Sequence, residues 1–232
     1  MAKQKSLPVS LSDRERWLGF FYLAFQLCVL PRLLYSLNDL LARPMATVWL
    51  NFLYFSLNFL FIFAIFKDFF HRCLVQAGKH ARSFLIAVLA GFCAYWLINF
   101  LLGLAIARFL PEFVNLNDST IADMGTEQFS VTVLGTVVLV PVVEETLHRG
   151  LVFGSLHRRQ PALAYLISTL LFAAIHIMGY VGIYAYDELA VAFVQYLPAG
   201  ILLAWAYQKS GSIFAPMLIH MAINAVGICV VR

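Results

Sequence analysis

Charged residues are scarce in this sequence. They make up 12% of its 232 residues, whereas hydrophobic residues make up 62%. An ordinary soluble domain has about 25% charged and about 45–50% apolar residues. The size of the chain does not explain this difference, so we expect that part of the protein surface contacts lipid. The net charge of +4 comes without a basic stripe and interleaved aromatics, which leaves nucleic-acid binding without support.

Cysteine is also rare. The four cysteines are scattered, and they form neither a CxxC pair nor a zinc-finger spacing. We therefore expect each to be a small buried hydrophobic residue. The apolar run that begins near Trp17 ends in Leu37-Asn38-Asp39 and lacks a small-residue cleavage site, so it predicts a retained membrane helix and not a signal peptide. Aromatic residues, including Tyr54, are expected to face lipid or to pack between helices.

Long apolar runs dominate the sequence and predict an all-α, polytopic membrane bundle. A membrane helix needs about 20 mostly apolar residues. Lys67–Arg82, between the second and third runs, is open to two interpretations, a short interfacial helix or a solvated loop. Seven runs qualify as spans: Trp17–Leu37, Met45–Phe66, Ser83–Leu110, Ser130–Phe153, Ala162–Met178, Leu189–Gln208 and Ser212–Val231.

The connecting segments alternate in charge. Lysine and arginine occur in the N-terminus and in the second, fourth and sixth loops, whereas the third loop, Pro111–Gln128, has acidic residues but no basic ones. This pattern predicts a multi-pass protein with a cytoplasmic N-terminus. The acidic loop separates the two expected regions, residues 1–110 with three helices and residues 130–232 with a four-helix catalytic core. The short chain favours a bacterial cytoplasmic membrane.

Polar residues in the spans are concentrated in the C-terminal region. A charge deep in a membrane helix costs about 2.5–3.5 kcal/mol on insertion scales, so each one requires a reason. From a rise of about 1.5 Å per residue, Glu144, His176 and Asn224 lie about 20–22 Å, and His220 about 14 Å, from the cytoplasmic ends of their spans. These depths predict one shared layer. The polar residues are Glu144, Glu145, His148, Arg149, His176, His220 and Asn224.

Their spacing indicates a chemistry. Glu145 and Arg149 are four residues apart and can pair on one face, whereas Glu144 points about 100° away from Glu145. Amide hydrolysis needs an activated water and a stabilised oxyanion. Glu144 and His176 would hold the water, and His220 and Asn224 would donate hydrogen bonds to the oxyanion. Glu145 and Arg149 would support the helix.

Three motifs resemble those of the CAAX-protease and bacteriocin-processing (CPBP, Abi-like) family of intramembrane proteases. Glu144–Arg149 resembles EExxxR, Phe172–His176 resembles FxxxH, and His220–Asn224 resembles HxxxN. The resemblance covers roughly Ser130 to Val231. It implies an endopeptidase that uses a glutamate-activated water, with Glu144 and His176 on the water and His220 and Asn224 at the oxyanion. His148 departs from the family, which usually has an apolar or aromatic residue there.

Two questions about the site stay open. Members of the family are often called metalloproteases, and Glu144, His176 and His220 would be the ligands if zinc were bound. Because the sequence has no HExxH motif, we favour a site without metal or other cofactor. His148 would tune the base, help to bind a metal, or be a hydrogen-bonded polar residue near the cytoplasmic side; we favour the last.

The implied partner is a membrane-embedded or lipid-anchored peptide or protein in the lipid bilayer. Two other classes of function are alternatives. A proton-coupled transporter also needs intramembrane Glu, His and Arg, although such proteins often have two related halves, which this chain lacks. A catalytically idle scaffold or bacteriocin-immunity protein would not need the complete set of catalytic residue types.

Overall fold

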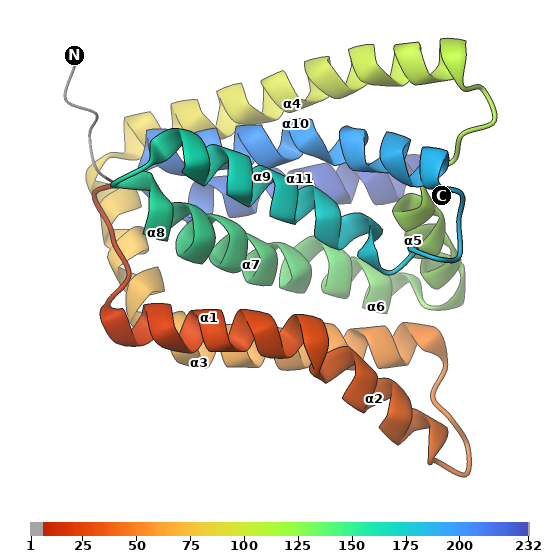
Figure 1. Cartoon of the computed structure of the whole chain (residues 1–232). Helices are drawn as coiled ribbons and strands as arrows, with labels where there is room; N and C mark the ends of the chain where they lie inside the picture. The colour runs from red at the N-terminus through yellow and green to blue at the C-terminus, as the bar shows by residue number, and fades with distance from the viewer. Residues whose placement is uncertain (1–6, 232) are drawn as a thin grey trace.

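The chain folds into helices throughout the range that the computed structural model describes, residues 7–231, in which no strand forms. The all-α class is therefore confirmed (Figure 1). The N-terminal part comprises α1 (Asp13–Cys28), α2 (Leu30–Asp39), α3 (Thr47–Lys79), α4 (Ala81–Phe109) and α5 (Leu116–Glu127). A continuous helical stretch follows, made of α6 (Phe129–Val133), η1 (Leu134–Leu139), α7 (Val140–Glu145), η2 (Thr146–Phe153) and α8 (Gly154–His157). The chain ends with α9 (Pro161–Met178), α10 (Tyr186–Ser210) and α11 (Phe214–Val231).

Within the described range, five helical segments are long and apolar enough to cross a membrane: α3, α4, the stretch Phe129–His157, α9 and α10. Together α1 and α2 would make a sixth, bent by 40°. Pro31 lies in the first turn of α2. Because proline has no backbone N–H, it cannot donate the hydrogen bond that would continue α1 into α2. The expected seventh span is the shorter apolar helix α11, so seven spans by length are not found. The fold is an integral membrane bundle.

Two expected connections are helical. Lys67–Lys79 is neither a loop nor a separate interfacial helix, because α3 continues to Lys79 and turns only at His80. Packing explains the difference, since Phe69, Phe70 and Cys73 from this part are buried in the core. The acidic segment Pro111–Gln128 contains α5, whose first amides donate to the Asn115 side chain.

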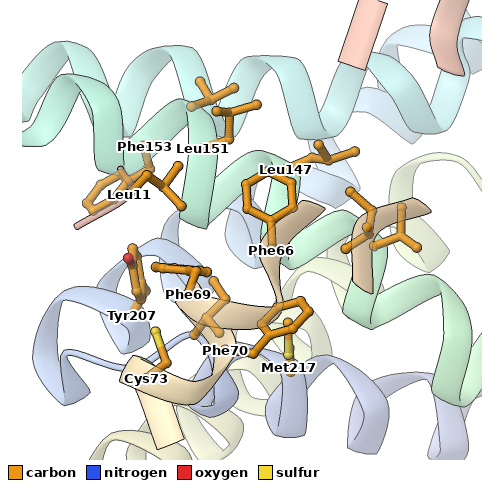
Figure 2. Close-up of a cluster of buried hydrophobic side chains, with 14 of the residues drawn as sticks. Leu11, Phe66, Phe69, Phe70, Cys73, Leu147, Leu151, Phe153, Tyr207 and Met217 are labelled. Carbon is orange, nitrogen blue, oxygen red and sulfur yellow. The ribbon is translucent and has the colours of Figure 1, made fainter. Parts of the chain in front are cut away.

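The helices α1, α2 and α3 lie on one side of the bundle, apart from α4. Figure 1 shows α1 and α3 lying together along one side, and α4 along the opposite side beside α10. Figure 2 shows Phe66 and Phe69 of α3 beside Leu147 and Leu151 of η2. This apolar core fixes the helix that carries the acidic motif against α3. Of the four cysteines, only Cys73 is buried, so burial was the wrong expectation for the other three.

Close packing of α9 against α10 brings backbone carbonyls toward η2. A Cβ atom on Gly200 would lie 2.7 Å from Thr169 Cγ2, so only glycine allows this approach without a shift. The carbonyls of Ala199 and Gly200 accept hydrogen bonds from Arg149 as a result. Small residues at this contact therefore place two acceptors beside the buried guanidinium.

Candidate active site

The acidic motif lies where the helix changes its winding. α7 is followed by η2, a π-helical turn, and such turns appear frequently at functional sites. The side chains leave this segment in three directions. Leu147 and Leu151 enter the apolar core, His148 lines a cavity together with Glu144, and Arg149 reaches α10. Side chains from this one helical segment thus contribute to the apolar core, to the cavity and to the ion pair.

A buried network holds Glu145. Its Oε1 accepts hydrogen bonds from Arg149 Nη1 at 3.1 Å and from His220 Nδ1 at 2.8 Å. The Arg149 guanidinium is fully buried, and its Cζ lies 4.1 Å from the centre of the Phe172 ring. The expected Glu145–Arg149 pair is present. Its link to His220, 75 residues away, could not be read from the sequence.

Glu144 faces two histidines. Its Oε2 lies 3.8 Å from His176 Nε2 and 4.0 Å from His220 Nε2. Both distances are too long for a hydrogen bond and fit the spacing of polar groups that share one water. The same oxygen is buried and has no hydrogen-bond partner among the described residues. Glu144 and Glu145 thus point in different directions, as the 100° offset indicated.

Hydrogen bonds orient both rings. His176 Nδ1 lies 2.8 Å from the Phe172 carbonyl, which can only accept, so Nδ1 carries the proton and Nε2 of the neutral ring has a free lone pair. Tyr196 stacks on His176 with ring centres 4.2 Å apart, and its hydroxyl donates to Asn115. The cap of α5 therefore supports the site. No pattern in the sequence pointed to Tyr196 or Asn115.

Asn224 has another immediate partner. Its Nδ2 donates to the Thr136 carbonyl at 2.8 Å, in the π-helical turn η1. One of its two N–H groups is therefore engaged in holding α11 against η1. The Nε2 atoms of His176 and His220 both lie within 4.0 Å of Glu144 Oε2. Asn224 lies one turn after His220 on α11.

A cavity of about 480 Å³ adjoins Glu144. This volume lies in the range of ligand pockets, about 300–1,000 Å³. Its lining comes from α1, α2 and α3 on one side and from α7, η2 and α9 on the other. Exposed Arg32 and Tyr35 of α2 belong to the lining, so the cavity reaches the surface beside α2. Tyr54 also lines it, and its ring packs edge-on against Phe55.

A metal ion needs several ligand atoms around one point. Among residues 7–231, no group of three or more His, Cys, Asp or Glu side chains could hold one. The two Nε2 atoms and the Glu144 carboxylate nevertheless face each other, which is the ligand type of some catalytic zinc sites. We derive no step through a metal, and metal dependence stays a question for the experiment below.

His148 of η2 is buried, with 1% of its surface exposed. It lies near the Glu144 carbonyl, but neither ring nitrogen makes a hydrogen bond of good geometry with the described residues. The ring meets Phe172 edge-on at 5.5 Å. The expectation of a hydrogen-bonded polar residue was therefore wrong. Aromatic packing is the only interaction of this side chain that the geometry supports strongly.

Replacing His148 with phenylalanine is expected to leave cleavage within about threefold of wild type and to keep or raise stability. A buried polar group without a partner costs about 1–3 kcal/mol, which the apolar ring would avoid. Turnover and the midpoint of thermal unfolding in detergent would measure both effects. A loss of cleavage as large as that of a Glu144 variant would instead make His148 a catalytic residue.

Comparison with known proteins shows what the C-terminal region is similar to. Residues 126–226 match the family model of the type II CAAX prenyl endopeptidase Rce1-like proteins. The UPF0177 protein YxdF of Lactococcus lactis subsp. lactis (strain IL1403) is 24% identical over 143 residues, which are 57% of this chain and 74% of that protein. An uncharacterized 24.3 kDa protein of Escherichia coli is 32% identical over 132 residues. This alignment spans 56% of each of the two chains. No solved structure shows a significant match.

All three motifs lie inside the matched range, and α1 to α4 lie outside it. The match supports an intramembrane protease of the CAAX type in general. Together with the apolar helices, it supports a membrane-embedded protein that acts on a membrane-associated peptide. Residues 126–226 are therefore similar to the Rce1-like type II CAAX prenyl endopeptidases, which confirms the resemblance that the motifs predicted.

Proposed function

We propose that this chain is an intramembrane endopeptidase in which Glu144 activates a water. The observation that carries the proposal is the meeting of Glu144 Oε2 with the Nε2 atoms of His176 and His220, at 3.8 and 4.0 Å, beside a cavity. Three polar groups from three helices converge at a place where lipid-facing side chains would be apolar. Such convergence has a cost that a catalytic role explains.

The reaction uses groups of this chain only. Glu144 accepts a proton from a water oriented by His176 Nε2, and the water oxygen bonds to the scissile carbonyl carbon. His220, whose Nδ1 donates to Glu145, donates from Nε2 to the oxyanion when its ring is protonated. The second N–H of Asn224 is a further donor. The proton on Glu144 then passes to the amide nitrogen, and the C–N bond breaks to give an acid and an amine.

Glu145 and Arg149 act as positioning residues in this scheme. Glu145 holds the His220 ring in one orientation through the hydrogen bond that its Oε1 accepts from Nδ1. Arg149 pairs with Glu145 at 3.1 Å and is held by two backbone carbonyls of α10. The substrate is a membrane-embedded or lipid-anchored peptide or protein. For a bacterial protein, peptide precursors or membrane proteins fit better than prenylated tails.

The proposal is tested by cleavage of a peptide library in liposomes, with and without a chelator. We expect wild-type protein to cleave in both conditions and the His176→Ala variant to lose most of its activity. Full activity of His176→Ala would remove this residue from the site. Activity lost with chelator and restored by zinc would replace the metal-free mechanism. A scaffold would cleave nothing, and a carrier would show flux instead.

A further inference from the structure

The N-terminal side of the cavity carries six polar side chains that the mechanism does not use, of which Arg32 and Tyr35 are exposed and Asn58 is hydrogen-bonded within the protein. Of the other three, Gln26 comes from α1, and Asn51 and Tyr54 come from α3. Residues three apart lie on the same face of a helix, so Asn51 and Tyr54 are neighbours. We call these three residues the polar wall. They share the cavity lining with Glu144, and Tyr54 lies within electrostatic reach of its carboxylate.

The polar wall has only weak partners within the protein. Gln26 is buried as a residue, with 7% of its surface exposed, and its carboxamide makes no hydrogen bond with any other described residue. Asn51 Nδ2 contacts the Met124 sulfur at 3.4 Å, and sulfur is a weak acceptor. The Tyr54 hydroxyl reaches the backbone carbonyl of Gln26 at 3.4 Å and also lies close to the Asn58 side chain.

Asn58, also on α3, shows the contrast. Its side chain accepts from the Tyr22 hydroxyl at 2.7 Å and donates to the Tyr54 carbonyl at 2.7 Å, so both ends of the amide are used. Asn58 therefore has a structural role. The three residues of the polar wall have no such pair of strong bonds and line the cavity, so their polar groups are available to a partner from outside the chain.

Peptide hydrolysis within a membrane supplies such a partner. In a membrane helix every backbone N–H and C=O is bonded within the helix, which covers the scissile bond. About one turn must unwind before a water at Glu144 can reach the carbonyl carbon, and the freed groups then need new hydrogen bonds. Primary carboxamides offer a donor and an acceptor, the same pair that a backbone amide presents, and the Tyr54 hydroxyl offers both as well.

We propose that the polar wall binds the unwound backbone of the substrate and holds the scissile bond against Glu144. This inference rests on the proposed peptidase. It names the substrate class as apolar segments that carry a helix-breaking residue, such as Gly or Pro, next to the cleaved bond, because these segments unwind at lower cost. The polar wall lies outside residues 126–226, so the part of the chain without a family match sets this preference.

Binding tests the inference without relying on turnover. The probe is a fluorescent Leu/Ala peptide with a central Gly-Pro pair and lysine ends, titrated in liposomes against the Glu144→Gln protein, which would hold the probe uncut. A second probe has an ester in place of the amide beside Gly-Pro, which removes one N–H and weakens one acceptor. A third has leucines in place of Gly-Pro. We expect the first probe to bind about tenfold tighter than either of the others, as one lost hydrogen bond predicts.

Gln26→Leu and Asn51→Leu, added to the Glu144→Gln protein, are expected to weaken binding of the first probe about tenfold and to abolish its advantage over the ester. Asn99→Leu is the matched control, since Asn99 lies in α4, away from the cavity, and bonds only to the Tyr95 carbonyl. Equal binding of all three probes to the Glu144→Gln protein would overturn the inference, and this comparison needs no substitution in the polar wall. If the ester weakened binding by the same factor in the Leu variants as in the unaltered polar wall, the two effects would be independent, and this result would overturn the inference too. A separate measurement tests the proposed peptidase: if the wild type shows no cleavage that depends on Glu144, the proposed function is wrong.

Discussion

Cleavage is expected to fall by about 10²–10⁴-fold when Glu144 is replaced by glutamine, which is the contribution of a general base. Glutamine keeps the size of the side chain but cannot take the proton of the attacking water. The fold should survive, because the buried Oε2 has no hydrogen-bond partner among the described residues that the change would break. Initial rates on a cleaved library peptide, with equal amounts of folded protein, measure the effect.

Glu112→Gln is the matched control for this substitution. Glu112 is an exposed carboxylate before α5 and does not line the cavity, so the same chemical change should leave the rate unaltered. If Glu144→Gln cleaved as fast as Glu112→Gln, the water-activating role would pass to another group. An equal loss in both variants would point to a general effect of charge on substrate binding.

Much of the candidate site was accessible from the sequence because charge in an apolar span is expensive. From their depths along the helices we expected Glu144, His176 and His220 in one layer. In the structure, the Nε2 atoms of both histidines lie within 4.0 Å of Glu144 Oε2. The helical offset of about 100° separated the two carboxylates correctly. These predictions needed only the rise and turn of a single helix.

Contacts between helices were not accessible in the same way. The bond from His220 to Glu145, the stacking of Tyr196 on His176 and the bond from Asn224 to Thr136 all depend on how distant helices are rotated about their axes. A single sequence carries no signal for that rotation. The π-helical winding of η2 was also invisible, because its residues read as an ordinary apolar helix.

The N-terminal helices show a different failure. They were interpreted as apolar spans, yet Gln26, Asn51 and Asn58 are carboxamides within predicted membrane helices. Asn51 and Asn58 are seven apart, with Tyr54 between them on the same face, and this spacing was the available signal. Uncharged amides cost less in lipid than charges do, which is why attention to charge alone passed over them.

The largest loss of stability is expected for Arg149→Met. The guanidinium is fully buried, pairs with Glu145 at 3.1 Å, donates to two carbonyls of α10 and lies over Phe172. Removing it leaves the Glu145 carboxylate buried without its cation, a change that costs about 3–5 kcal/mol for buried pairs. The free energy of unfolding in mixed detergent micelles containing sodium dodecyl sulfate measures this cost.

A double replacement separates two contributions to the free energy of unfolding, the cost of an unpaired Glu145 charge and the stabilisation by the Glu145–Arg149 pair. Adding Glu145→Gln to Arg149→Met removes the stranded carboxylate, so we expect much of the lost stability to return, while cleavage stays low because His220 loses its anionic partner. Arg149→Lys should recover little, since an ammonium group cannot reproduce the planar fork that reaches Glu145 and the α10 carbonyls together. An Arg149→Met protein as stable as wild type would show that the buried ion pair does not hold η2 against α10. His220 would then owe its orientation to the packing of α11 alone.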